Sequence, residues 1–462
     1  MTIQTEVLIV GDGQAATPLA TALAKAGRSV AVAERRQLGG SCVNFGCTPT
    51  KAAIASARIA HQARRASEYG ISIEQVDVDF GAVIGRAQRI RDRMRASLAD
   101  TLGPPDNPRL IHGHARFIGR DDRGFRMLVA EDEVSCSSVI LDTGTRSALP
   151  PIDGLSDISF LDASNWLEHQ DRPSHVAILG AGYIGMEMAQ FYRRMGCRVT
   201  VFDTGDQILH NEDEDVSTAL FKTLEAEGVA FSLATTVTRV QNHNGGVRLS
   251  FDRNDPALLP GTLDASHVFI ATGRQPNTDD LGLDTIGVQT DDHGFVVVDE
   301  KLRTSVDGVW AAGDIRGGPM FTHTAWDDGR ILQAQLLDDG SDTTLRTVPY
   351  AVFTDPQLGR VGLTEREARA AGKSFKVGRF DMASNGKAQE TGEESGLIKV
   401  LVDERSNTLL GAAVLSADAA ELVHGYVNVM NAGAPIDVIR DAVFIHPTLT
   451  EATQSVLSTL TR

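Results

Sequence analysis

The chain opens with a short, continuously apolar run at residues 7–10, a glycine-containing turn, an alanine-rich segment of helical character and a second apolar run at residues 29–34. Apolar runs without polar alternation are typical of parallel strands that are buried on both faces. The same order returns at mid-chain, where apolar runs at residues 176–179 and 198–203 flank a segment that we expect to be helical through Arg194. The pattern therefore predicts an α/β protein with two strand–turn–helix–strand units.

Small residues occupy the turn of each unit at the spacing of a dinucleotide-binding fingerprint. In the first unit Gly11 makes the tight turn, Gly13 lets the backbone approach a diphosphate, and Ala16 takes the small position where the helix packs on the strand. Glu34 ends the next strand, where a carboxylate can accept hydrogen bonds from ribose hydroxyls. The corresponding residues of the second unit are Gly180, Gly182, Gly185 and Asp203. A glycine turn also occurs in unrelated α/β units, but two complete fingerprints predict two Rossmann-like domains that bind two dinucleotides.

Asp203 also bears on the choice of coenzyme. It is followed by Thr204, Gly205 and Asp206, with no Arg or Lys to meet a 2′-phosphate. This favours NAD over NADP at the second fingerprint.

Further apolar runs end in small residues where the backbone can approach a ligand, although each of them could also be a simple turn. These run ends are Thr143 and Gly144, then Gly273 and Arg274, and then Gly313 and Asp314. The carboxylate of Asp314 at a strand end is well placed to bind a sugar-alcohol hydroxyl. Around Pro349 the pattern changes to apolar runs at 397–402 and 409–415 followed by helical segments, which predicts a separate α+β domain.

Cys42 and Cys47 lie just beyond the first fingerprint and are separated by four residues. The rise of a regular helix, about 1.5 Å per residue, would place them farther apart than a disulfide allows. Asn44 and Gly46 supply the irregular backbone that could close this gap. Because a cofactor bound at the fingerprint can lie close to the sulfurs, we interpret the two cysteines as a redox pair.

Other uses of the cysteines are less consistent with the sequence. A zinc site needs four ligands, and the remaining cysteines, Cys136 and Cys197, have no neighbouring His or Cys at ligand spacing, so we expect no metal site. Both lie in apolar, strand-like contexts and are interpreted as small core residues. A purely structural disulfide or buried thiols remain the alternatives for Cys42 and Cys47.

The composition and net charge indicate which classes of binding partner are unfavourable for this chain. A hydrophobic content of 42% with 23% charged residues is ordinary for a soluble enzyme, and the net charge of −17 disfavours nucleic acid and anionic membrane surfaces. The N-terminus runs straight into a strand without a basic, cleavable leader, and no apolar run approaches the length of a membrane span. We expect a cytoplasmic protein with no membrane or nucleic-acid partner.

Near the C-terminus, His446 and Pro447 precede Glu451 in a segment that we expect to open the final helix, with Pro447 at its first position. A carboxylate at this distance could hold the imidazole in one tautomer. A histidine beside a carboxylate is a proton-transfer pair if a thiol can reach it, and otherwise a surface or capping residue.

These motifs together resemble the class I pyridine nucleotide-disulfide oxidoreductase family, which includes glutathione reductase, dihydrolipoamide dehydrogenase and mercuric reductase. The resemblance covers essentially the whole chain and rests on both fingerprints and on residues 39–51, 271–276, 311–314 and 446–451, in family order. It implies FAD at the first fingerprint, a nicotinamide cofactor at the second, and a C-terminal domain that forms a homodimer. Electrons would pass from NADH through FAD to a Cys42/Cys47 disulfide and on to a small-molecule disulfide or a soft metal ion.

The resemblance also implies domain boundaries and residue roles. Residues 1–150 would form the FAD-binding domain, 151–275 the NAD(P)-binding domain, 276–345 a return to the FAD-binding or central domain, and 346–462 the dimerisation domain. Cys47 would face the flavin, Cys42 would attack the substrate, Lys51 would pair with Glu187 near the flavin, and Tyr183 would cover the nicotinamide pocket. A nearby cation and the helix that starts after Cys47 would lower the thiol pKa.

The remaining assignments follow the same resemblance. His446 and Glu451 would complete the catalytic site of the neighbouring subunit. The residues expected to bind the two cofactors are Gly11, Gly13, Ala16, Glu34, Arg35, Gly40, Ser41, Lys51, Ala115, Thr143, Gly144, Gly180, Gly182, Tyr183, Ile184, Gly185, Glu187, Asp203, Val237, Gly273, Arg274, Gly313 and Asp314.

The substrate is not decided by these motifs. Residues 60–65 and 321–327 resemble the mercuric reductase branch, yet residues 455–462 lack the paired cysteines of that enzyme. Phe444 stands where dihydrolipoamide dehydrogenase has a second histidine, and Asp203 with the acidic composition argues against glutathione reductase. We therefore predict a mercuric-reductase-like disulfide reductase. A dihydrolipoamide dehydrogenase or glutathione reductase, a dithiol-independent NADH oxidase or diaphorase, and a redox or metal sensor or assembly subunit are the alternatives.

Overall fold

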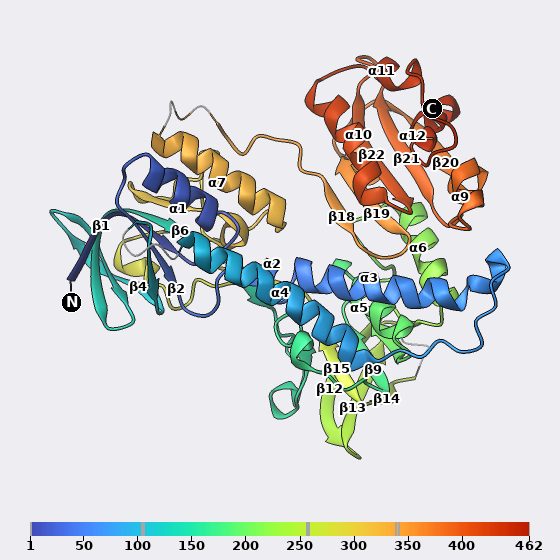
Figure 1. The fold of residues 1–462 in the computed structure, drawn as a ribbon, viewed down its shortest axis with the longest axis horizontal. Helices are drawn as coiled ribbons and strands as arrows, with labels where there is room; N and C mark the ends of the chain where they lie inside the picture. Colours follow the sequence, from blue (N-terminus) through green and yellow to red (C-terminus); the bar gives the residue numbers. More distant parts are fainter. Residues whose placement is uncertain (1, 103–106, 256–258, 338–339, 341, 462) are drawn as a thin grey trace.

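A mixed sheet near the N-terminus carries the first fingerprint on its parallel strands in the computed structural model, which describes residues 2–102, 107–255, 259–337, 340 and 342–461 (Figure 1). Its strand order is β3-β2-β1-β6-β5-β4, and β17 also pairs with β6. The strands are β1 (Thr2–Val10), β2 (Val30–Glu34), β3 (Arg109–His112), β4 (Ala115–Asp121), β5 (Gly124–Val129), β6 (Asp132–Leu141) and β17 (Val309–Ala311). Val10 pairs in parallel with both Ala33 and Leu141, so the carboxyl ends of β1, β2 and β6 meet at one edge.

Helices cover this sheet and connect it to the next one. They are α1 (Ala16–Lys25), α2 (Gly40–Asn44), α3 (Cys47–Arg64), α4 (Phe80–Leu102) and α7 (Thr322–Leu337). Figure 1 shows α1 and α7 beside the first sheet, whereas α3 and α4 extend from it toward the middle of the molecule. Because β17 pairs with β6, the chain returns to the first sheet after the middle domain.

The second fingerprint lies on a parallel sheet of order β11-β10-β9-β15-β8. Its strands are β8 (Leu161–Asp162), β9 (His175–Leu179), β10 (Arg198–Phe202), β11 (Ala230–Ser232) and β15 (His267–Ile270). The helices of this domain are α5 (Tyr183–Arg194) and α6 (Glu214–Ala226), and an antiparallel sheet of β12 (Thr235–His243), β13 (Gly246–Arg253) and β14 (Gly261–Ala265) adjoins it. The short pair β7 (Thr145–Ser147) and β16 (Arg274–Pro276) joins the two nucleotide-binding parts.

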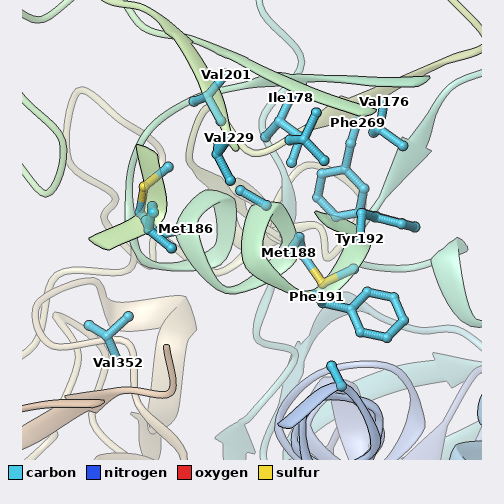
Figure 2. Close-up of a cluster of buried hydrophobic side chains, with 14 of the residues drawn as sticks. Val176, Ile178, Met186, Met188, Phe191, Tyr192, Val201, Val229, Phe269 and Val352 are labelled. Atoms are coloured by element: carbon cyan, nitrogen blue, oxygen red, sulfur yellow. The ribbon is translucent and has the colours of Figure 1, made fainter. Parts of the chain in front are cut away.

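One hydrophobic core packs α3, the helix that begins at Cys47, against the second nucleotide-binding domain and the C-terminal domain. Figure 2 shows Met186, Met188, Phe191 and Tyr192 of α5 packed against strand residues, with Val352 approaching from the C-terminal domain. The same cluster contains buried alanines of α3, the helix that begins at Cys47. Burial of large apolar side chains contributes roughly 1.5 to 3 kcal/mol each, so this core holds the cysteine segment firmly against the second domain.

The C-terminal part is an antiparallel sheet of order β18-β19-β22-β21-β20 with helices on it (Figure 1). Its strands are β18 (Tyr350–Val352), β19 (Gln357–Gly362), β20 (Phe375–Asp381), β21 (Leu397–Asp403) and β22 (Leu409–Ser416), and its helices are α8 (Glu365–Ala370), α9 (Gly386–Glu390), α10 (Ala419–Asn431), α11 (Asp437–Arg440) and α12 (Glu451–Ser455). Single 3₁₀ turns are η1 (Ala66–Tyr69), η2 (Leu155–Asp157), η3 (Trp166–Glu168), η4 (Leu283–Thr285), η5 (Gly313–Arg316), η6 (Met382–Ser384) and η7 (Val456–Thr459). The predicted fold class, with two dinucleotide-binding domains and an α+β C-terminal domain, is confirmed.

One local prediction was wrong. Pro447 does not begin the final helix, because α12 starts only at Glu451 and residues 446–450 form an irregular turn. The carboxylate of Glu451 accepts the backbone N–H of Thr448 at 2.9 Å, which stabilises this turn in place of another helical turn. Elsewhere, no helix in the described part of the chain is both long and apolar enough to cross a membrane.

Candidate active site

The carboxyl ends of the parallel strands in the two nucleotide-binding sheets border a common cavity of about 2510 Å³. Both cysteines and most of the predicted cofactor-binding residues line it, including the less obvious candidates Arg35, Ala115, Ile184 and Val237. The predicted site residues that do not line the cavity are Ala16, Gly185, Gly313, His446 and Glu451. Ligands of α/β proteins bind at such strand ends, so the fold brings two dinucleotide sites and the cysteine pair to one place.

The first fingerprint turn passes so close to a neighbouring strand that it leaves no room for a side chain. Gly11 has φ +95°, and a Cβ there would lie 2.4 Å from the carbonyl oxygen of Asp142. Glu34 fixes the turn from the other side, since its Oε2 accepts the N–H of Asp12 at 2.9 Å and its Oε1 accepts the N–H of Arg36 at 2.6 Å. The open backbone and the carboxylate at the cavity wall fit a dinucleotide such as FAD.

The second fingerprint repeats this arrangement. Gly180 has φ +108°, and a Cβ there would lie 2.3 Å from the carbonyl oxygen of Ala271. Asp203 accepts the N–H of Ala181 at 2.6 Å and that of Gly205 at 2.7 Å, which holds its carboxylate at the cavity wall. This wall fits the adenosine part of a nicotinamide dinucleotide.

A break between two helices brings the cysteines together. Asn44 is the last residue of α2 and its side-chain amide donates to the carbonyls of Leu38 and Gly40, so Asn44 stabilises the helix and is not itself the irregular position. The break lies at Phe45, whose carbonyl accepts the indole N–H of Trp166 at 2.9 Å, and at Gly46. Cys47 is then the first residue of α3. Both cysteines are free thiols in this structure.

The two thiols have different acidities. The Cys42 thiol donates a hydrogen bond to the Cys47 sulfur, and together with the positive charge of Lys51 this outweighs burial and lowers the pKa of Cys47 to about 6. Thr322 Oγ1 lies 3.0 Å from the same sulfur and stabilises the thiolate further. The hydrogen bond to Cys47 and burial raise the pKa of Cys42. At neutral pH the reduced pair is therefore a Cys47 thiolate beside a Cys42 thiol.

The positive charge that lowers the pKa of Cys47 belongs to Lys51, which forms an ion pair with Glu187. Lys51 Nζ lies 2.8 Å from Glu187 Oε2, and Glu187 Oε1 also accepts the backbone N–H of Phe353 at 2.9 Å. The ammonium lies 4.7 Å from the centre of the Phe353 ring, within the range of a cation–π contact. Burial opposes the charge, but Glu187 and the Cys47 sulfur outweigh it and raise the pKa of Lys51. Lys51 thus stays cationic next to the thiolate.

An aromatic wall closes the cavity on the side of the second fingerprint. The ring of Tyr183, the first residue of α5, lies 5.3 Å from the ring of Tyr350 and 6.5 Å from that of Phe321. Phe321 precedes Thr322, so this wall continues to the contact with Cys47. A flat nicotinamide ring is the kind of group that such a wall can cover.

Several of these contacts were not predicted. Thr322, Tyr350 and Phe353 come from segments remote in sequence. Residues 321–327 were singled out only for their resemblance to the mercuric reductase branch, so only the folded chain reveals these contacts. Asp142 had a local signal that we did not use: it precedes Thr143 and Gly144, whereas the matching strand end of the second unit has Ala271 before the same Thr-Gly pair.

His446 and Glu451 form a pair of their own that does not line the cavity of the same chain. His446 Nδ1 lies 3.0 Å from Glu451 Oε1, and the histidine side chain is 77% exposed. The backbone N–H of Thr448, followed by the histidine, lowers the pKa of Glu451. Val443 and Ile445 on the same turn are 100% and 79% exposed, respectively. The turn therefore presents an imidazole with its Nδ1 engaged, flanked by apolar side chains on the surface.

Two dinucleotide sites that converge on a polarised cysteine pair define a flavin- and nicotinamide-dependent dithiol oxidoreductase. Residues 5–329 match the family model described as pyridine nucleotide-disulphide oxidoreductase, and residues 348–457 match the dimerisation domain of that family. The chain belongs to the pyridine nucleotide-disulphide oxidoreductases, whose members use FAD and a nicotinamide cofactor to act on a disulfide.

Named relatives match the chain along nearly its whole length. It is 32% identical over 458 residues to the probable pyridine nucleotide-disulfide oxidoreductase RclA of Escherichia coli, covering 98% of each chain. It is 32% identical over 464 residues to a mercuric reductase of Streptomyces lividans, covering 99% of this chain and 96% of the relative. It is 31% identical over 462 residues to a dihydrolipoyl dehydrogenase of Cupriavidus necator, covering 98% and 97%.

The fold is also similar to that of a solved flavoprotein disulfide reductase. The Cu(II) complex of the HOCl-induced flavoprotein disulfide reductase RclA from Escherichia coli superimposes with a TM-score of 0.89 at 32% identity, covering 98% of this chain and 99% of that one.

Proposed function

We propose that this enzyme passes electrons from NADH through FAD to the Cys42/Cys47 disulfide and on to a disulfide or a soft metal ion. The observation that carries the proposal is the polarised thiol pair: one cavity-facing sulfur with a pKa lowered to about 6, hydrogen-bonded to a second thiol with a raised pKa. FAD, when bound, supplies an acceptor for hydride and a donor of electrons to the disulfide. The predicted cofactor residues that line the cavity would hold it and the nicotinamide dinucleotide.

The two cysteines have separate roles in this proposal. Cys47, the more acidic thiol, is held as a thiolate toward the flavin by Lys51 and Thr322. Cys42 is the cysteine that attacks the substrate in this proposal. The attacking species is a thiolate, so its proton must first pass to a base, the role that we assign to His446 of the second copy. Glu187 keeps Lys51 in place, so that the cation stabilises the Cys47 thiolate of the reduced pair.

We infer that the working enzyme is a homodimer in which His446 acts on the cysteines of the other subunit. Within one chain His446 does not line the cavity, and the exposed Val443 and Ile445 beside it are suited to burial against a second copy. The dimerisation domain over residues 348–457 supports this arrangement. A dithiol that cycles between thiol and disulfide suits the cytoplasm, where we place the enzyme.

The acceptor is tested by comparing substrates directly. NADH oxidation by the FAD-bound dimer should be measured with oxidised glutathione, lipoamide, coenzyme A disulfide, Hg(II) and Cu(II). A thiolate pair suits soft metals as well as disulfides, and Cu(II) belongs in the screen because the RclA structure contains it. We expect one of these acceptors to give turnover that the Cys42→Ser variant loses. Turnover that survives Cys42→Ser with every acceptor would contradict the proposal and indicate a dithiol-independent NADH oxidase.

Coenzyme choice should depend on Asp203. Its carboxylate, held by the backbone of Ala181 and Gly205, can accept ribose hydroxyls and repels a 2′-phosphate. We expect kcat/KM to favour NADH over NADPH, and Asp203→Arg to shift the ratio toward NADPH by about tenfold or more, since a hydrogen bond to a charged group contributes roughly 1.5 to 3 kcal/mol. Steady-state kinetics with both coenzymes measures this, with Asp206→Arg as the matched control. A wild-type enzyme that uses NADPH equally well would contradict the assignment.

A further inference from the structure

Asp142 places a buried carboxyl group directly beneath the first fingerprint. The residue follows β6 and is 4% exposed, and its Oδ2 accepts the backbone N–H of Ala16, the first residue of α1, at 3.1 Å. A Cβ on Gly13 would lie 2.6 Å from both carboxyl oxygens. The glycine at this position therefore makes room for the Asp142 side chain as well as for a ligand.

The second nucleotide-binding unit shows that the carboxyl group is not needed to build this turn. The carbonyl of Asp142 faces Gly11 in the same way as the carbonyl of Ala271 faces Gly180, since a Cβ on either glycine would lie 2.4 Å or 2.3 Å, respectively, from the facing oxygen. Asp142 and Ala271 are thus equivalent strand-end positions. Only the FAD-side unit has an acid there, at the helix N-terminus where a dinucleotide diphosphate binds.

The charges around Asp142 are mostly negative. Carboxylates of Asp12, Asp314 and Asp328 face it from the fingerprint turn, η5 and α7. Asp12 accepts hydrogen bonds from Thr17 and from the backbone of Gly39.

The nearby cations are already engaged by other carboxylates. Arg316 and Arg346 both bind Asp328 at 2.7 Å, and Arg274 lies 3.8 Å from Asp314. Among the described residues, no Lys or Arg forms an ion pair with Asp142. An ionised Asp142 would therefore add an uncompensated negative charge to a buried acidic cluster that must also accept a diphosphate.

We propose that Asp142 is a neutral carboxylic acid in the FAD-bound enzyme, where it positions the first turn of α1 under the diphosphate without adding charge. Its oxygen accepts the N–H of Ala16, and its hydroxyl is a donor that a phosphate oxygen or a neighbouring carboxylate can use. This proposal depends on the FAD cofactor of the family and not on the identity of the acceptor.

The direction of the pKa shift agrees with this geometry. Burial, followed by the charges of Asp12, Asp328 and Asp314, raises the pKa of Asp142 well above that of an ordinary aspartate. A raised pKa means that the neutral form is retained at low pH and lost as the pH rises through that pKa. A bound diphosphate raises it further, so FAD affinity should fall at alkaline pH, by up to about tenfold per pH unit while one proton is lost.

The test measures protonation and flavin retention without using turnover. Infrared difference spectra of the FAD-bound wild type and the Asp142→Asn variant at neutral pH should show a protonated carboxyl C=O band that only the wild type has. FAD release, followed by recovery of flavin fluorescence from about pH 6 to about pH 9, should accelerate with pH in the wild type and stay constant in Asp142→Asn. If Asp142→Asn does not fold, Asp142→Ala, which copies Ala271, serves in both measurements.

Asp328→Asn is the matched control, because Asp328 is an arginine-paired acid of the same cluster and its replacement should leave the carboxyl band in place. Absence of a protonated carboxyl band attributable to Asp142 would overturn the proposal. So would FAD release at neutral pH that slows about tenfold or more in Asp142→Asn, which would mean that an ionised Asp142 repels the diphosphate. Equal pH dependence in both proteins would assign the effect to another group.

Discussion

Replacement of Cys47 by serine should abolish the long-wavelength absorption band that appears when the wild-type enzyme is reduced anaerobically by two electrons from NADH. That band requires a thiolate beside the oxidised flavin, and the lowered pKa of Cys47 makes it the thiolate of the pair. A serine hydroxyl stays protonated at neutral pH and cannot form a disulfide with Cys42. Turnover of disulfide or metal acceptors should therefore fall to the uncatalysed background while FAD remains bound, as absorbance spectra of the purified variant will show.

Cys42→Ser is the matched control for this experiment. It removes the attacking thiol but retains Cys47, so it should lose turnover and show the band already in the oxidised enzyme, before NADH is added, because no disulfide can form and the Cys47 thiolate lies beside oxidised flavin. Addition of NADH should then remove the band, because the two electrons stay on the flavin. The band should also respond to pH with a defined sign: because the pKa of Cys47 is lowered to about 6, the thiolate and its band persist above that pH and disappear below it. Persistence of the band in Cys47→Ser would contradict the assignment of Cys47.

Replacement of His446 by alanine should give the second large loss of activity. A general acid–base contributes ~100-fold to ~10,000-fold in rate, so His446→Ala should slow disulfide turnover by that order while reduction of the flavin by NADH stays nearly unchanged. The reason is that His446 moves the proton of the attacking and leaving thiols and has no part in holding FAD. Glu451→Gln should give a smaller loss, because it weakens the contact at Nδ1 but leaves the imidazole in place. Rapid mixing separates the two half-reactions.

Mixed dimers test whether His446 acts across the subunit boundary. Dimers of a Cys42→Ser subunit and a His446→Ala subunit retain one complete site only if the histidine of one chain serves the cysteines of the other. We expect such hybrids to regain activity that neither parent has. Inactive hybrids would mean that the histidine serves its own chain, and an equal loss in both half-reactions of His446→Ala would indicate a structural role.

Local chemistry made much of the fold and of the site predictable. The runs at residues 7–10 and 176–179 became β1 and β9 because a buried parallel strand needs apolar side chains on both faces. Gly11 and Gly180 were recognisable because each turn passes within contact distance of a neighbouring strand, where only glycine fits. Cys136 and Cys197 are buried in the core, as their apolar contexts predicted. Pro447 was misjudged because a contact from Glu451 to the turn competes with the helical start that proline favours.

The tertiary structure determined the pKa values of the two cysteines. The positions of Cys42 and Cys47 were evident from their spacing, but the pKa difference between them depends on Lys51 and Thr322, and Thr322 reaches the sulfur from 275 residues away along the chain. The acidic cluster around Asp142 likewise forms only when β6, η5 and α7 pack together. Motifs record which backbone conformations and side chains a segment can offer, because those depend on near neighbours. Charges and hydrogen bonds act through space, so the acidity of a buried group is determined by whichever distant residues the folded chain brings within a few ångströms of it.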